Sequence, residues 1–357
     1  MATEGWSVLT QRINTLRKPL TSISTRFRSL SPTTQTVVEN VVIWTIAALA
    51  VWWVARGLTL GKFVASFKHA NLPLFLTANL TSFFIWWLGE TYLFARLFSL
   101  FHKPCSFREV LAPSAAQYFL QVVNILVAAA ALVLFLNRRK GVSWTAASWT
   151  LLFQGFIDAI LLATGFVAAG VLRPQSPIHR FLPYACAALL FFIAVAWWWG
   201  HGRPRRRAWQ WLYDWPGLHA FRAAGWHEYL ELGLIRLAIF LPQGFLFYLE
   251  MRAFRADVPL DATLALTPGL LLAAGEPITP SGLGPLQAVM VDGLMRFAPR
   301  ARLLTAGLAI SIMHILCRLP LGVGAAGTFV RRVLTSEGQP TQAQPSTGSQ
   351  ASALAHQ

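Results

Sequence analysis

The chain has 357 residues, of which 55% are hydrophobic and 12% are charged, and its formal net charge is +16 at pH 7. Soluble globular domains carry about 25% charged residues, so this composition excludes such a domain and indicates a polytopic membrane protein. The basic residues lie in short segments between apolar runs, which favours anionic lipid headgroups over nucleic acid as their partner. We therefore expect an all-α, multi-pass helix bundle integral to the plasma (inner) membrane.

Residues 1–36 form a basic segment ahead of the first apolar run. Apolar side chains recur every three or four positions from Trp6 to Leu30, with arginines and lysines between them. This period predicts an amphipathic helix that lies in the plane of the lipid headgroups. A cleaved transit peptide is the alternative, because the segment is rich in Arg, Ser and Thr and has Glu4 as its one acidic residue.

Apolar runs long enough to cross a bilayer follow, and residues 37–334 are the predicted membrane domain. The predicted full spans are Val37–Ala55, Leu72–Leu97, Val110–Leu136, Thr145–Leu172, Phe181–Trp199, Tyr229–Leu249 and Ala301–Val330. With the N-terminus inside, this count puts the basic clusters Arg138–Lys140 and Arg203–Arg207 outside. That arrangement runs against the positive-inside tendency, so either one span is miscounted or the tendency is weak here.

Two shorter apolar runs, Leu260–Gly275 and Leu286–Phe297, flank a stretch rich in proline and glycine. Three prolines and two glycines lie between Pro277 and Pro285, so a continuous helix would lose backbone hydrogen bonds and clash with the proline rings. We expect a re-entrant pair of half-helices that meet at an irregular turn, as in many transporters. Ser281 or Gly284 would cap the second half-helix, with Pro285 in its first position. A tight connection between two ordinary helices is the alternative.

The stretch from Pro277 to Ala288, with the sequence PITPSGLGPLQA, resembles the signature of the flippase-like membrane domain of lysylphosphatidylglycerol synthases. Residues 90–96 (ETYLFAR) are similar to the second-helix pattern of that family, and residues 154–158 (QGFID) to its glutamate-arginine-x-x-aspartate stretch. Gln287 stands where the family usually has glutamate. The resemblance implies a helical membrane domain that moves a lipid with an anionic or zwitterionic headgroup between leaflets.

The residues after Arg332 carry no apolar period, and residues 335–357 are expected to be a disordered tail. They leave no room for the soluble aminoacyl-transfer domain of the two-part synthases, so we expect the membrane domain alone.

Ionisable side chains inside a membrane are costly and are candidates for functional sites. Asp158 lies near the middle of its run, and Glu276 begins the broken stretch. Arg318 shares a helical face with His314 and is suited to a lipid phosphate, or to pairing with Asp158, Glu276 or Asp292. Glu90 with Arg96 and Glu231 with Arg236 are further candidate pairs, and Arg96 is expected to extend to the interface.

Three amides, Gln117, Gln121 and Asn124, would share one face of a continuous third span and form a polar stripe. Their commoner use is hydrogen bonding between helices. The predicted substrate-binding residues are Glu276, Pro277, Thr279, Pro280, Ser281, Gly282, Gly284, Gln287, Asp158, Gln121, Asn124 and Arg318.

The expected function is binding of a lipid or lipid-linked substrate and its translocation between leaflets, without a cofactor or a metal. Catalytic motifs of nucleotide hydrolases, metalloproteases and serine hydrolases are absent from the sequence, so we do not expect an enzyme. The alternatives are a membrane enzyme or accessory subunit of a lipid or glycan pathway, and a structural scaffold. A homo-oligomer or a partner enzyme is compatible with each of them.

Overall fold

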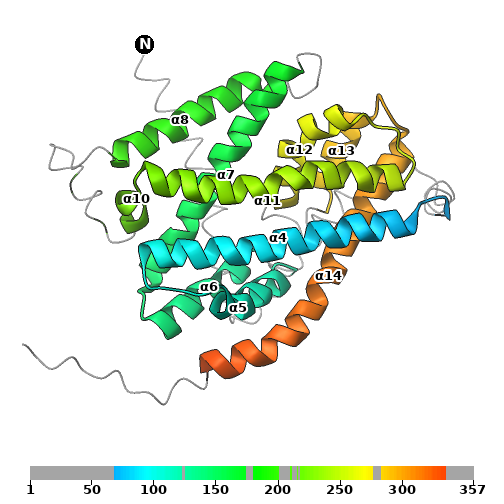
Figure 1. Cartoon of the computed structure of the whole chain (residues 1–357). Helices are drawn as coiled ribbons and strands as arrows, with labels where there is room; N and C mark the ends of the chain where they lie inside the picture. Colours follow the sequence, from blue (N-terminus) through cyan, green and yellow to red (C-terminus); the bar gives the residue numbers. More distant parts are fainter. Residues whose placement is uncertain are drawn as a thin grey trace, which may run out of the picture.

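The computed structural model describes residues 68–122, 125–173, 180–200, 218–275 and 283–334, together with Gln210 and Trp215. These residues form helices and connecting turns without a strand, which confirms the predicted all-α bundle. Figure 1 shows their arrangement. The helices are α4 (Leu72–Phe101), α5 (Phe107–Leu120), α6 (Ile125–Lys140), α7 (Trp144–Leu172), α8 (Leu182–Gly200), α10 (His219–Ala223), α11 (Trp226–Ala253), α12 (Leu260–Gly275), α13 (Pro285–Leu294) and α14 (Arg300–Leu334).

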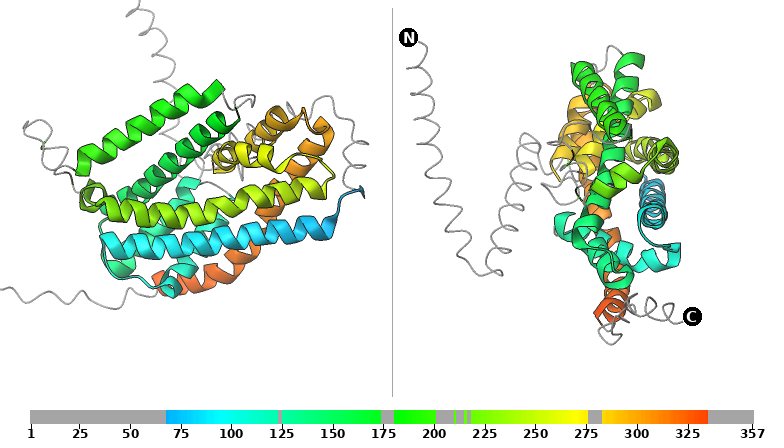
Figure 2. Two further views of the ribbon diagram at one scale, coloured as in Figure 1. Left: turned by 45° about the horizontal axis from the view of Figure 1, so that its top comes forward. Right: turned by 90° about the vertical axis from the view of Figure 1, so that its left-hand side faces the viewer.

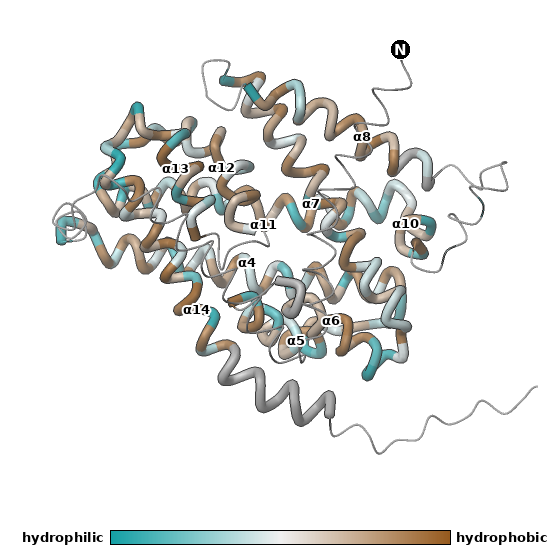
Figure 3. Tube along the Cα trace, turned by 180° about the vertical axis from the view of Figure 1, so that it is seen from behind, coloured by the Kyte–Doolittle hydropathy of each residue, from teal (hydrophilic) through white to brown (hydrophobic). Residues whose placement is uncertain are grey.

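Four of these helices, α4, α7, α11 and the Arg300–Leu321 part of α14, are long and apolar enough to cross a membrane. They confirm four of the predicted spans. A fifth, Phe181–Trp199, corresponds to α8, which is apolar along most of its length, whereas hydrophilic residues gather at helix ends such as that of α6 (Figure 3). The predicted span Val37–Ala55, the amphipathic segment 1–36 and the tail 335–357 lie outside the described residues.

The predicted third span, Val110–Leu136, is wrong, because this run forms two helices, α5 and α6, that pack against each other. A continuous helix of that length would hold its ends about 40 Å apart, at 1.5 Å per residue. Instead, Lys140 at the end of α6 lies 3.2 Å from the carboxylate of Glu109 at the start of α5 and donates to the carbonyl of Pro104 at 2.7 Å. The run is therefore a second pair of half-helices that enters and leaves on one face.

This pair removes one full span from the count. The end of α6, with Arg138–Lys140, now lies on the same face as the end of α4. If α4 ends on the inner face, this cluster is inside as well. Under that condition, Arg138–Lys140 no longer conflict with the positive-inside tendency.

Two halves of the chain repeat the same order of elements, a spanning helix, two half-helices and a second spanning helix. In the first half these are α4, α5, α6 and α7, and in the second α11, α12, α13 and α14. The contacts correspond too, since α5 packs against α14 as α12 packs against α7. α4 and α11 run antiparallel side by side (Figures 1 and 2), with Asn79 bonded to Glu250 near one end and Arg96 to Glu231 near the other. The halves therefore have opposite directions across the membrane, which is an inverted repeat.

Local sequence sets where the helices begin. The side chains of Asn71 and Ser143 accept hydrogen bonds from the backbone N–H groups of Leu74 and Ala146 in the first turns of α4 and α7. Ser106 and Glu109 form a capping box at the start of α5. These caps satisfy backbone donors that a helix start leaves open.

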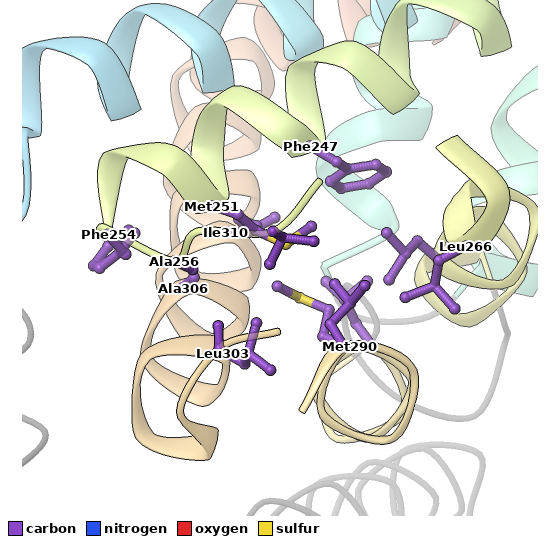
Figure 4. Packing of buried hydrophobic residues seen from close by; sticks show 14 of the residues in the cluster. Phe247, Met251, Phe254, Ala256, Leu266, Met290, Leu303, Ala306 and Ile310 are labelled. Carbon is purple, nitrogen blue, oxygen red and sulfur yellow. The ribbon is translucent and has the colours of Figure 1, made fainter. Parts of the chain in front are cut away.

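The apolar core of the second half lies between α11, α12, α13 and α14 (Figure 4). Met251, Leu266, Met290, Leu303 and Ile310 point toward one another there, and each is at most 5% exposed. Burial at this density fixes how the half-helix pair α12–α13 is seated on the spanning helices.

Close packing of α7 on α12 depends on Gly165, and this yields a first prediction. A Cβ atom at Gly165 would lie 2.8 Å from Cγ of Pro268, whose ring cannot swing away, whereas a Cβ atom at Gly155 on the same helix would meet nothing within 4 Å. We expect Gly165→Ala to lower the free energy of unfolding by about 1–3 kcal/mol through overpacking. The matched control Gly155→Ala should be neutral or stabilising by up to about 1 kcal/mol, since alanine favours helix. Thermal unfolding of the purified protein in detergent measures both, and equal melting temperatures would contradict this account of the α7–α12 contact.

Candidate functional site

A buried cluster of charged side chains joins α4, α7 and α11. Arg236 on α11 donates from Nη1 to Glu90 on α4 at 2.8 Å, and from Nε and Nη2 to both carboxylate oxygens of Asp158 on α7 at 2.6 and 2.8 Å. The hydroxyl group of Tyr118 on α5 donates to the other oxygen of Glu90 at 2.8 Å. The side chains of Arg236, Glu90 and Asp158 are 5%, 8% and 20% exposed. Each charged group therefore has a partner of opposite charge on another helix, as burial in an apolar medium requires.

Neutral groups complete the surroundings of this cluster. Gln154 donates to Asp158 at 2.6 Å from one turn earlier on α7. The guanidinium group of Arg236 also lies 4.7 Å from the ring centre of Phe240 and 5.5 Å from that of Trp86, within the range of cation–π attraction. Asp158 is the most exposed of the three charged residues.

The charged cluster borders a cavity of about 1620 Å³. This volume exceeds the 300–1,000 Å³ or so typical of small-molecule sites. The cavity has ionic groups at several places and largely apolar walls. Its charged and titratable lining residues are Glu90, Tyr118, Asp158, Arg180, Tyr184, Arg236, Asp292, His314 and Arg318.

Part of the cavity lining is apolar and exposed. Trp144 and Leu152 of α7, Tyr184 of α8 and Leu272 of α12 are all more than half exposed and belong to the lining. In a membrane, exposed apolar side chains of spanning helices contact lipid tails. We therefore expect this exposed part of the lining, on α7, α8 and α12, to be the opening of the cavity toward the hydrocarbon region.

Both half-helix pairs border this cavity. Gln117 and Gln121 at the end of α5 and Ala129 and Ala130 early in α6 line it, as do Gly275 at the end of α12 and Pro285 at the start of α13. Broken backbone at membrane depth is tolerated where protein covers it or where it lines a cavity. The position of both breaks satisfies this condition.

The start of α13 has the predicted cap. Gly284 is the N-cap with φ +99°, a conformation that favours glycine, and Pro285 follows in the first turn. Gln287, which is fully buried, accepts from the backbone N–H of Gly284 at 2.6 Å and donates to the carbonyl of Gly307 at 2.9 Å and the hydroxyl group of Ser311 at 3.0 Å. Gln287 thus ties the start of α13 to α14 from behind the cavity.

The structure brings some of the predicted site residues together. Asp158, Gln121 and Arg318 line the cavity, whereas Gly284 and Gln287 are buried and support the start of α13 without lining it. α5 ends at Leu120, and Gln121 is the residue after it. The predicted stripe of Gln117, Gln121 and Asn124 along one continuous helix is therefore not formed. Seven predicted residues lie outside the described ones, and their roles remain predictions: Asn124, Glu276, Pro277, Thr279, Pro280, Ser281 and Gly282.

The ion pairs differ from those expected. Glu90 and Arg236 pair with each other, and Arg96 pairs with Glu231 at 2.6 Å, so each predicted partner is exchanged across the two antiparallel helices. Two of the predicted ion-pair partners of Arg318 pair with other arginines: Asp158 with Arg236, and Asp292 with Arg180 at 2.7 Å. The guanidinium group of Arg318 lies 5.8 Å from the ring centre of Tyr118.

Sequence reasoning left Glu90, Tyr118 and Arg236 out of the site. A signal was present for Glu90 and Arg236, since both are ionisable residues well inside apolar runs. No local pattern marks Tyr118, because its partner Glu90 is 28 residues earlier on a different helix. Within the described ranges, no group of three or more His, Cys, Asp or Glu side chains could hold a metal ion.

Comparison with known families adds a match along most of the chain. The family model described as the lysylphosphatidylglycerol synthase TM region matches residues 40–322. This range includes the whole charged cluster and both half-helix pairs. No curated protein shows significant similarity to the chain.

The charged cluster yields a prediction about stability. Arg236→Met removes the ion-pair partner of both Glu90 and Asp158, and we expect it to lower the free energy of unfolding by about 3–5 kcal/mol. Arg96→Met removes the other ion pair between α4 and α11, but its partners are 41% and 37% exposed, so its cost should be about 0–1 kcal/mol. Unfolding in detergent, followed by tryptophan fluorescence, compares the two variants. The triple variant Arg236→Met, Glu90→Gln, Asp158→Asn should recover most of the loss, and a cost of Arg236→Met no larger than that of Arg96→Met would contradict this account.

Proposed function

Because the chain belongs to the lysylphosphatidylglycerol synthase transmembrane family, whose membrane proteins are related to lipid metabolism or transport, we propose that it binds a lipid or lipid-linked substrate in the cavity and moves it between leaflets. The observation that carries the proposal is the cavity itself, with ionic groups in its lining and an exposed apolar opening between α7, α8 and α12. The membrane is proposed to be the plasma membrane.

An amphipathic substrate suits both parts of this cavity. Its headgroup would lie among the charged residues while its tails remain in the hydrocarbon region beyond Leu152 and Tyr184, which line the opening. This division avoids burying either a charge without a partner or an apolar chain in water.

Headgroups of both signs find complementary groups. Asp158 is partly exposed and offers a carboxylate to a headgroup amine, and Arg318 offers a guanidinium group to a phosphate. The start of α13 adds the partial positive charge of a helix N-terminus, with Pro285 and Ala288 in the lining. A lipid with a phosphate, alone or together with an amine, is therefore the proposed substrate class. The proposal is for transport and not for catalysis.

Filling the cavity tests this route. Ala288 on α13 is an exposed alanine in the cavity lining, and Ala238 on α11 is an exposed alanine outside it. We expect Ala288→Phe to slow leaflet exchange by about tenfold, equivalent to about 1.4 kcal/mol on the barrier, and Ala238→Phe to leave it unchanged. The measurement uses proteoliposomes with lipids labelled on anionic, zwitterionic or cationic headgroups, and a membrane-impermeant quencher.

The two variants must first show equal insertion and equal melting temperatures. Exchange by wild type that Ala288→Phe leaves at full rate would show that lipid does not pass through this cavity. Absence of exchange for every headgroup class would remove lipid translocation as the function.

A further inference from the structure

The interface between α4 and α11 carries a series of polar contacts along its length. Arg96 with Glu231, Glu90 with Arg236 and Ser82 with Gln243 are followed by a last pair, in which Asn79 Nδ2 donates to Glu250 Oε1 at 3.0 Å. Glu250 is 1% exposed. The other two glutamates in the series face an arginine, whereas Asn79 is the polar partner of Glu250 within the described part of the chain.

Two oxygen atoms of the Asn79–Glu250 pair have no hydrogen-bond partner. They are Asn79 Oδ1 and Glu250 Oε2, and both are buried. An ionised carboxylate only accepts hydrogen bonds, so in that state nothing can donate to Asn79 Oδ1 from Glu250. A buried polar atom without a partner costs about 1–3 kcal/mol.

A single proton satisfies both atoms. When Oε2 of Glu250 is protonated, it becomes a hydrogen-bond donor. Its acceptor is then Oδ1 of Asn79, whose Nδ2 already donates to Oε1 of Glu250. A neutral carboxylic acid and an amide then form two hydrogen bonds in one ring. A metal ion fits less well, because hard cations require about six oxygen ligands and the residues one helical turn away, Phe75 before Asn79 and Phe247 and Phe254 on either side of Glu250, are apolar.

Charged groups on the surrounding helices do not reach Glu250. α4 has no titratable side chain between Leu72 and Glu90, and on α11 itself Arg252 is paired with Asp257. Burial and the hydrogen bond from Asn79 are what act on the charge of Glu250, and the other titratable groups of α11 and of the helices packed against it do not. Besides the paired residues named above, these groups are Tyr92 of α4, His227, Glu228, Tyr229 and Tyr248 of α11, Asp158 of α7, Asp261 of α12, and Arg300, Arg302, His314, Cys317 and Arg318 of α14.

We propose that Glu250 is a proton-binding site, neutral in this structure through its pairing with Asn79, and that proton release and uptake there drive the movement of lipid. The second part rests on the proposed function. α4 and α11 belong to different halves of the inverted repeat, so Glu250 lies at the boundary between the halves. Loss of the proton places an uncompensated charge at this boundary, and water entry or separation of α4 from α11 relieves it. Protonation therefore biases the equilibrium between two arrangements of the halves.

Infrared difference spectroscopy of the purified protein tests the proton site without lipid transport. A protonated carboxyl group has a carbonyl stretch separate from that of a carboxylate. We expect this band near neutral pH and its loss as the pH is raised. Glu250→Gln should abolish the band and still fold, because glutamine makes the same two hydrogen bonds with Asn79. The matched control Glu231→Gln, on the same helix in an exposed ion pair, should leave the band intact. A spectrum that Glu250→Gln does not change would overturn the proposal.

Proteoliposomes with a pH gradient test the coupling. Exchange by wild type should change when the gradient is imposed or reversed, and exchange by Glu250→Gln should not respond to the gradient. An equal response of the two proteins would overturn the coupling. Absence of exchange in wild type under every gradient would remove the proposed function, and the coupling with it, whereas the infrared result decides the proton site by itself.

Discussion

The pairing of Arg236 with two buried carboxylates is the interaction on which the centre of the molecule depends. Its guanidinium group has three donor atoms in a rigid plane, and they are bonded to carboxylates 146 and 78 residues earlier in the chain, on α4 and α7. A lysine could not span both partners, because it presents a single compact charge. The planar guanidinium group of Arg236 therefore fixes the positions of α4, α7 and α11 relative to one another. It thereby also fixes one side of the cavity.

The half-helix pairs meet a second constraint, that every buried backbone group needs a partner. At the start of α13 this partner is Gln287, whose amide both accepts from Gly284 and donates to α14. A glutamate at this position would keep the acceptor but would turn its second oxygen toward the carbonyl of Gly307. Glutamine thus ties α13 to α14 without a charge, and the start of the half-helix does not depend on one.

The sequence predicted those parts of the fold that have a local cause. Apolar runs identified α4, α7, α8, α11 and α14, and the glycine and proline at positions 284 and 285 predicted where α13 begins. The break between α5 and α6 has no such cause, since residues 121–124 are Gln-Val-Val-Asn and contain neither proline nor glycine. What marks this break is the ion pair between Glu109 and Lys140, which lie at the two ends of the run, far apart in the sequence. Asp158 was identified as a site residue from its place near the middle of an apolar run, but its partner Arg236 was not, because pairing depends on which helices become neighbours.

The inverted repeat shows which parts of the chain the buried charged cluster connects. Its acidic and phenolic groups, Glu90, Tyr118 and Asp158, come from the first half, and the arginines that meet them, Arg236 and Arg318, come from the second. Attraction across the cavity therefore holds the two halves together. Under the proposed function, an ionic headgroup that enters would compete for these partners and weaken the attraction between the halves, since each group can satisfy only a limited number of bonds. Substrate binding and separation of the halves would then be linked through the same side chains, as movement of one repeat against the other around a fixed site requires.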